Sequence, residues 1–200
     1  MKHNELVQKM LEIVDFLWIV PSAENLSLSI WRNDFTFLEL KQNFRNTREI
    51  VKTTISYAEE ENYAYYKGIV MPPENFPAGC PPIVVNSFED AMKEARKRTR
   101  NGILVVSDRL YIDCNYLNQM KEKWKVYHYF QNDFKANENP YKFLQEGNVL
   151  IVDGRLTIGI EWTTVIVFGL RLAYEDENLH NCNRMMRCTT NLIVVKVHSF

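Results

Sequence analysis

The sequence predicts an α/β domain in which helices flank a parallel sheet. Short apolar runs rich in β-branched residues, such as 149–152 (V-L-I-V) and 165–168 (V-I-V-F), are too short for helices. Such runs are typical of strands that are buried on both faces. Amphipathic segments long enough to form helices, as at 88–100, separate these runs. Strands that alternate with helices in this way predict βαβ units and therefore parallel pairing.

The alternation is regular from Pro82 onward. Strands are predicted at 83–85, 103–106, 126–130, 149–152 and 165–168, and helices at 88–100, 115–124 and 141–145. Ser87 stands where it can cap the first of these helices, and Gly102 stands where that helix would end. Pro140 opens the last of them and Gly147 closes it.

The chain before Pro82 is less regular. Residues 5–18 carry apolar side chains at helical spacing, which predicts a helix. A strand is expected at 35–40 and a helix at 47–61. Five of the seven prolines fall within 71–82, so this stretch is predicted to be a loop. We therefore expect two parts: an N-terminal helix and lead-in at 1–34, the remnant of a preceding domain, and a main domain at 35–200.

Composition limits the classes of function. The formal net charge is −1, so the chain as a whole lacks the basic footprint of an autonomous nucleic-acid binder, although a local patch remains open. The four cysteines are scattered without zinc-ligand spacing, which predicts reduced thiols and no metal site. No apolar run approaches the roughly 20 residues of a membrane span, so no membrane partner is expected. These features predict an intracellular protein, cytoplasmic or nuclear.

The stretch at 157–162 (T-I-G-I-E-W) is the most unusual in the sequence. Gly159 allows the backbone to pass close to another group. Glu161 and Trp162 follow it and directly precede a predicted buried strand. We expect both side chains to stand at the mouth of the sheet, where open α/β folds bind ligands.

Three stretches carry a resemblance to a known family. Residues 157–162 resemble the G-x-E-[WF] signature, motif V, of superfamily 1 helicases of the UvrD/Rep type. Residues 38–50 (L-E-L-K-Q-N-F-R-N-T-R-E-I) are similar to motif IV of that family, L-x-x-N-[YF]-R-x-[ST]-x-x-I. Residues 182–195 (C-N-R-M-M-R-C-T-T-N-L-I-V-V) are similar to motif VI, a helix with an arginine followed by a strand. The motifs occur in the family's order and span roughly residues 36–197.

The resemblance implies the second RecA-like domain of a P-loop NTPase. The sequence contains no G-x-x-x-x-G-K-[ST] loop, and no Asp-Glu pair follows an apolar strand. A chain without a phosphate-cradling loop is not expected to hold ATP tightly by itself. ATP with Mg²⁺ would be bound mainly by a Walker-motif RecA-like domain, joined in cis or in trans. The predicted function is the C-terminal half of an ATP-dependent helicase, a hydrolase only when that partner is present.

The resemblance also implies roles for individual residues. Arg45 would reach the γ-phosphate, and Arg187 would act as the arginine finger, because a guanidinium delivered from a second domain couples closure to phosphoryl transfer. Glu161 would contact the nucleotide sugar, with Gly159 and Arg184 also at the nucleotide. Each charged residue has a structural alternative. The arginines could be solvated at helix surfaces, and Glu161 could be a capping or ion-paired carboxylate.

Single-stranded nucleic acid is the second expected partner. The resemblance places Thr157, Trp162 and Arg155 near its backbone or bases. Trp162 has the alternative of packing in the core. The helix at 88–100 is basic, which is compatible either with nucleic-acid contact or with a solvated surface.

The sequence departs from the family pattern at four positions. Ile158 and Arg155 stand where the family usually has Lys and His, and Met186 and Cys188 stand where it has Ser or Thr and Ala. These departures favour an alternative, a catalytically inactive helicase-like scaffold or nucleic-acid-sensing module. An unrelated Rossmann-like enzyme would need a Gly-rich first βα turn, and the sequence has none.

Overall fold

The computed structural model describes residues 9–10, 12–13, 43–60, 69–107, 123–124, 126–129, 139–157, 159–169 and 181–196. Only the backbone is described for 126–129 and Arg155. The chain divides into two compact units, Met1–Leu40 and Lys41–Phe200, and the sheet belongs to the second. The strand predicted at 35–40 and most of the helices predicted at 5–18 and 115–124 lie outside the described residues. The predicted boundary after residue 34 stays a prediction.

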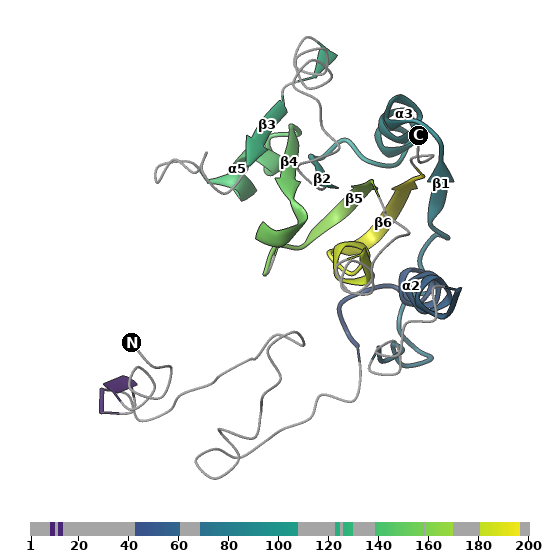
Figure 1. Cartoon of the computed structure of the whole chain (residues 1–200), viewed down its shortest axis with the longest axis vertical. Coiled ribbons are helices and arrows are strands. Elements are labelled where there is room, and N and C mark those ends of the chain that lie inside the picture. Colours follow the sequence, from purple (N-terminus) through teal and green to yellow (C-terminus); the bar gives the residue numbers. More distant parts are fainter. Residues whose placement is uncertain are drawn as a thin grey trace. The chain divides into compact units, whose positions relative to one another are not determined.

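The described strands form one six-stranded parallel sheet, as predicted (Figure 1). Its order is β1-β6-β5-β2-β4-β3. The strands are β1 (Ile83–Val85), β2 (Ile103–Ser107), β3 (Val126–Tyr129), β4 (Val149–Asp153), β5 (Trp162–Phe168) and β6 (Cys188–Val195). Each predicted strand from 83 onward is present. The strand expected at 165–168 begins three residues earlier, at Trp162, where β5 already pairs with Cys188 of β6.

Helices cover both faces of the sheet, which explains why the central parts of its strands are apolar runs rather than alternating patterns. On one face, Ile103 and Val105 of β2 join a core with α3 (Phe88–Arg98). On the other face, Leu104 and Val106 join a core that includes Ile50 of α2 (Arg48–Glu60). The alternation of strand side chains thus separates two cores, with α2 and α3 on opposite faces.

Local signals account for the helix ends. The Ser87 side chain accepts a hydrogen bond from the backbone N–H of Asp90 at 3.1 Å, which caps α3 as predicted. Asn139 caps α5 (Pro140–Gln145), whose first residue is the proline that the sequence places there. A further short helical segment at 181–185 precedes β6. It lies on the α2 face, where Met185 is buried in the same core as Ile50.

The proline-rich stretch is a loop, as predicted, and it has a structural role that the sequence did not indicate. The carbonyls of Pro77 and Ala78 accept hydrogen bonds from the N–H groups of Arg48 and Glu49, at 3.2 and 2.9 Å. These donors belong to the first turn of α2 and have no partner within the helix. The loop therefore closes the N-terminus of α2.

The position of Glu161 and Trp162 requires a correction. Trp162 is the first residue of β5, so both residues lie at the amino-terminal end of that strand. The ligand rule for open α/β sheets concerns the carboxyl ends of strands. The expectation that these residues stand at that mouth is wrong. The connection 154–161 runs from the carboxyl end of β4 back to the amino-terminal end of β5. We call the side of the sheet formed by the amino-terminal ends of β5 and β6 the amino-terminal edge.

Candidate functional site

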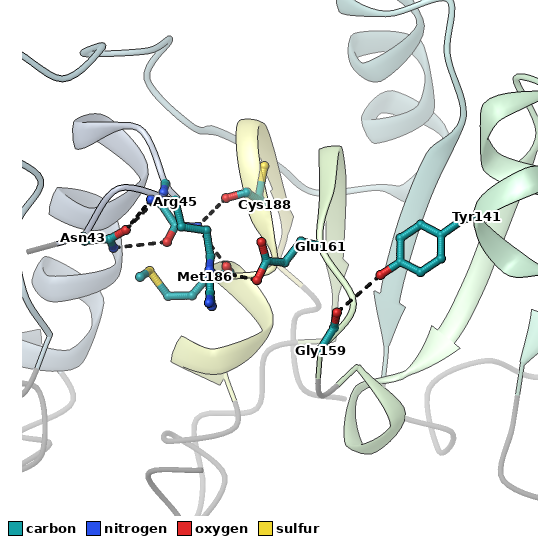
Figure 2. Close-up of polar contacts among 8 residues, drawn as sticks. Asn43, Arg45, Tyr141, Gly159, Glu161, Met186 and Cys188 are labelled. Carbon is teal, nitrogen blue, oxygen red and sulfur yellow. Dashed lines mark hydrogen bonds and ion pairs between the residues drawn. The ribbon is translucent and has the colours of Figure 1, made fainter. Parts of the chain in front are cut away.

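Two residues from distant segments meet at this amino-terminal edge. Arg45 Nε lies 2.8 Å from Glu161 Oε1 (Figure 2). The two side chains are 56% and 32% exposed, so the ion pair faces solvent. Exposed pairs of this kind contribute about 0–1 kcal/mol to stability. Arg45 is thus held in place by a partner that an incoming anion can replace at little cost.

A tight turn presents Arg45. The Asn43 side-chain oxygen accepts hydrogen bonds from the backbone N–H groups of Arg45 at 2.9 Å and Asn46 at 3.2 Å. This is the turn in which an asparagine side chain replaces a backbone carbonyl. It ends directly before Thr47 and α2. The backbone around Arg45 is therefore fixed although its side chain is exposed.

Asn46 joins this turn to the segment that carries Arg187. Its side chain is fully buried. The amide nitrogen donates to the backbone carbonyls of Met186 at 2.8 Å and Cys188 at 2.6 Å. The next residue continues the connection, because the Thr47 N–H donates to the Thr189 carbonyl at 3.3 Å. Motifs IV and VI of the sequence resemblance are thus in direct contact.

Arg187 is half-buried in the turn between the helical segment 181–185 and β6. Its backbone carbonyl accepts a hydrogen bond from the Trp162 N–H at 3.0 Å. That bond places the backbone of Arg187 beside the residue that follows Glu161. The structure therefore brings the backbone segments of Arg45, Glu161 and Arg187 together at one edge.

Arg184 is more deeply buried than a residue that contacts a ligand from the solvent would be. It is 7% exposed, and its Nη1 donates to the Asn181 side-chain oxygen at 3.3 Å. A Cβ added to Gly154 would lie 2.2 Å from Arg184 Nε, so only a glycine leaves room for the guanidinium. This contact packs the start of the β4–β5 connection against the motif VI segment.

The other motif V residues make contacts within the protein. The Thr157 hydroxyl is buried and donates to the Gly154 carbonyl at 2.6 Å. Trp162 Nε1 donates to the Gly102 carbonyl at 2.7 Å, and its ring packs against the core on the α2 face. The structural alternative for Trp162, core packing, matches this geometry. Arg155 lies in the 3-10 turn Gly154–Leu156.

Gly159 and Tyr141 form an exposed surface beside the ion pair. Gly159 has φ = +80°, which favours glycine. Apart from its two chain neighbours, no atom of the described residues lies within 4 Å of the position that its Cβ would take. The Tyr141 hydroxyl donates to the Gly159 carbonyl at 3.3 Å (Figure 2). Its ring centroid lies 6.4 Å from that of Trp162. Gly159 of this surface and Glu161 of the ion pair lie on the same loop, on either side of Ile160.

An exposed aromatic ring adjoins Arg45. Phe44 is 63% exposed, and its ring contacts Phe76 of the proline-rich loop edge to face, with centroids 6.2 Å apart. A large apolar side chain held in solvent next to a cation is suited to stack on a planar ligand that also carries negative charge.

Two buried thiols lie beneath the edge. Burial raises the pKa of the Cys188 thiol to about 12 and that of the Cys182 thiol to about 11. Both thiols are therefore neutral packing groups at physiological pH and not nucleophiles. Within the part of the chain that the structure describes, no three His, Cys, Asp or Glu side chains are arranged to hold a metal ion.

The chemistry of the edge is that of an anion site. Guanidinium groups present forked N–H donors that match phosphate oxygens. Arg45 offers such a group at the surface, and Arg187 lies on the adjoining segment. Glu161 is a carboxylate that can accept hydrogen bonds from hydroxyl groups. The described residues thus suit a phosphate with an attached hydroxylated group, and they offer no ligand cluster for Mg²⁺.

The comparisons with known proteins agree with the architecture. No protein-family model matches the sequence, and no curated protein is detectably similar to it. Among solved structures, the chain is similar to the crystal structure of the C-terminal domain of a possible DNA helicase from Lactobacillus plantarum WCFS1. The TM-score is 0.50 at 19% identity, and the match covers 79% of this chain and 89% of that chain. The fold is that of a helicase C-terminal domain. At this identity the likeness shows the fold alone, and the UvrD/Rep-type motifs stay a prediction.

No described helix has the length and apolar character to span a membrane.

Sequence reasoning missed three contributors to the site. Asn46 and Phe44 lie inside the motif IV stretch, but no pattern in that stretch indicates that Asn46 is buried against motif VI and that Phe44 is exposed. Tyr141 lies in none of the three motif-like stretches, and its contact with Gly159 spans 18 residues. A polar residue directly before a predicted helix could have flagged Asn46, although only as a helix cap.

Proposed function

We propose that this chain supplies one half of a composite ATP site in a superfamily 1 helicase-like protein. Arg45 and Arg187 neutralise the transferred phosphate, and Glu161 accepts a hydrogen bond from the nucleotide sugar. Gly159 lets the loop approach the nucleotide, and Arg184 supports the segment from within. A Walker-motif RecA-like domain, in cis or in trans, would supply the other half and most of the contacts to ATP and Mg²⁺.

The observation that carries this proposal is the meeting of Arg45 and Glu161. The pair joins residues 116 positions apart, with a separation of 2.8 Å, and it is largely solvent-exposed. Because such a pair contributes little to the free energy of unfolding, folding stability alone does not account for its position. The same two side chains are the cation and the hydrogen-bond acceptor that a nucleotide requires. Nucleotide binding would exchange the Glu161 carboxylate for a phosphate as the partner of Arg45.

The residues of this chain have limited tasks in hydrolysis. ATP with Mg²⁺, held mainly by the partner domain, supplies the reactive phosphate. Arg45 and Arg187 offset negative charge on the phosphate oxygens, which is where charge redistributes during phosphoryl transfer. Phe44, exposed beside Arg45, offers a face on which the nucleotide base can stack.

Single-stranded nucleic acid is the proposed second ligand of the same loop. The exposed features there are Tyr141 and the open backbone at Gly159. Thr157 and Trp162 hold the loop from within through their hydrogen bonds to backbone carbonyls. We assign them to shaping this surface, and Arg155 to its electrostatic attraction for the strand.

Binding of ATP to the chain alone tests the nucleotide proposal. Isothermal titration of the chain with Mg²⁺-ATP should show weak binding. Arg45→Ala or Arg187→Ala should each weaken it about tenfold, since a charge-assisted hydrogen bond contributes roughly 1.5–3 kcal/mol. Lys97→Ala is the matched control, because it removes a surface cation from α3, far along the chain from these segments. An ATP affinity that is equal in all four proteins would refute the proposal, as would no binding at all.

A further inference from the structure

The side chain of Asn46 makes three hydrogen bonds within the protein, two donated by its nitrogen and one accepted by its oxygen. It is completely buried, and its amide nitrogen donates to two backbone carbonyls, of Met186 at 2.8 Å and Cys188 at 2.6 Å. Its oxygen accepts a hydrogen bond from the Asn43 side-chain amide at 3.1 Å. The two carbonyls belong to the residues on either side of Arg187. Asn46 itself directly follows Arg45.

These bonds close a ring of contacts around the edge. Arg45 pairs with Glu161, and the next residue, Trp162, donates its backbone N–H to the carbonyl of Arg187. Asn46, the residue after Arg45, closes the ring through its hydrogen bonds to Met186 and Cys188, the neighbours of Arg187. Together with the bond from the Thr47 N–H to the Thr189 carbonyl, five directional contacts fix to one another three segments that are far apart in the sequence. The Asn46 side chain supplies two of the five.

We propose that Asn46 is a positioning residue that sets the distance between Arg45 and Arg187, so that both guanidiniums reach one polyphosphate. This inference rests on the proposed nucleotide half-site. The chemistry of the side chain explains the choice of residue. A carboxamide holds two N–H donors on one rigid plane, so it can bind the carbonyls of two residues that flank a third. Aspartate would turn acceptor oxygens toward those carbonyls, and serine would offer a single donor.

Coupling between the two arginines is the property to measure. When two cations bind one phosphate group, removing one changes the effect of removing the other. Dissociation constants for Mg²⁺-ATP would be measured for the chain, Arg45→Ala, Arg187→Ala and the double variant. The same four proteins would then be measured with Asn46→Ala added. Asn46→Ser retains one donor, and it provides a milder variant if Asn46→Ala fails to fold.

Thr54→Val is the matched control for a purely structural effect. The Thr54 hydroxyl is buried in α2, donates to the Ile50 carbonyl at 2.9 Å, and lies 3.7 Å from the Met185 sulfur. Its loss disturbs packing between α2 and the motif VI segment and leaves the Asn46 donors in place. Urea unfolding and circular dichroism would establish that each compared variant is folded.

The expected results distinguish the positioning role of Asn46 from the nucleotide half-site on which that role rests. Asn46→Ala should weaken ATP binding about tenfold, and the arginine substitutions should then act independently, each by less than about threefold. Asn46→Ser should fall between, and Thr54→Val should keep both the affinity and the coupling. Arginine-dependent ATP binding with coupling unchanged by Asn46→Ala and Asn46→Ser would overturn the positioning role alone. ATP binding that ignores both arginines, or no binding, would overturn the half-site and the positioning role together.

Discussion

Two charged regions of this molecule differ in how their charges are used. Helix α3 carries several basic residues, and most of the contacts given by their side chains are nearby in sequence. Lys93 pairs with Asp90 and Lys97 with Glu94, each one turn away. Arg96 donates to the Asn101 carbonyl at 3.1 Å and to the Gly147 carbonyl, 51 residues away, at 3.0 Å. These contacts hold the surface of one helix, its C-terminal loop and the turn after α5.

The amino-terminal edge of β5 and β6 has fewer charges, and its contacts span most of the chain. The Arg45–Glu161 pair and the bonds from Asn46 to Met186 and Cys188 join segments more than 100 residues apart. A dense run of charge therefore marks a solvated helix here, whereas sparse charges tied together at long range mark the candidate site. Four predictions sharpen or break this comparison.

The largest expected difference is in folding stability. Asn46→Ala leaves two buried carbonyls without their donor and should lower the free energy of unfolding by about 3 kcal/mol. Ser87→Ala removes only the local cap of α3 and should cost about 1 kcal/mol. Urea denaturation of both variants measures the difference. Equal losses would show that the long-range bonds carry no special weight.

The second prediction concerns desolvation beneath the edge. The pKa of the Cys188 thiol is raised from 9.0 to about 12, so the thiol stays neutral in the folded state. The stability that this contributes is complete below pH 9 and is lost as the pH rises toward 12, because only the unfolded chain ionises. Between pH 7 and pH 10 the loss should be on the order of 1 kcal/mol.

Urea denaturation at several pH values measures this loss, with Cys188→Ala as the control. That variant should lack this part of the alkaline decline and keep the part due to Cys182, whose thiol pKa is also raised. An identical pH dependence in the two proteins would indicate that Cys188 is accessible to water.

The third prediction separates the two roles proposed for the exposed ion pair. Glu161→Gln removes the anion that pairs with Arg45, so inorganic triphosphate should bind about threefold more tightly. ATP should gain less, because Glu161 is also proposed to contact the sugar. Competition titrations with the two ligands measure the ratio. Glu94→Gln, which frees Lys97 on α3, is the control and should change neither affinity. Equal gains in affinity for both ligands would contradict the proposed contact between Glu161 and the sugar.

The smallest effect is expected when ion pairs are removed for stability alone. Arg45→Ala and Lys97→Ala should each change the free energy of unfolding by less than about 0.5 kcal/mol, since both pairs face solvent. Thermal or urea unfolding of the two variants measures the change. A loss above about 2 kcal/mol in Arg45→Ala would mean that this pair is structural, and its proposed exchange for phosphate would fail.

The sequence predicted the sheet well because the strand signal is local. Runs such as 149–152 are apolar throughout, which follows directly from burial on both faces. The helix cap at Ser87 and the helix start at Pro140 are local signals as well, and both were confirmed. The start of β5 was misplaced because Trp162 and Thr164 pair with β6, with a register shift between them, without forming an apolar run.

The site was less predictable, for a physical reason. The pairing of Arg45 with Glu161 depends on tertiary packing and could be anticipated only through resemblance to a family. The edge on which Glu161 lies was wrongly predicted, since sequence alone does not show where a connection crosses the sheet. Asn46 was not predicted at all. A buried amide that binds backbone carbonyls of a distant segment leaves no periodic pattern in the sequence.

Steady-state hydrolysis of Mg²⁺-ATP by this chain tests the central claim most directly. It should be measured with and without single-stranded nucleic acid, and in Arg187→Ala. Because the 200 residues contain no phosphate-cradling G-x-x-x-x-G-K-[ST] loop, the account predicts no turnover above background in any of these conditions. Turnover that nucleic acid stimulates and that Arg187→Ala abolishes would contradict the account, because it would place a complete ATP site within this chain or its dimer.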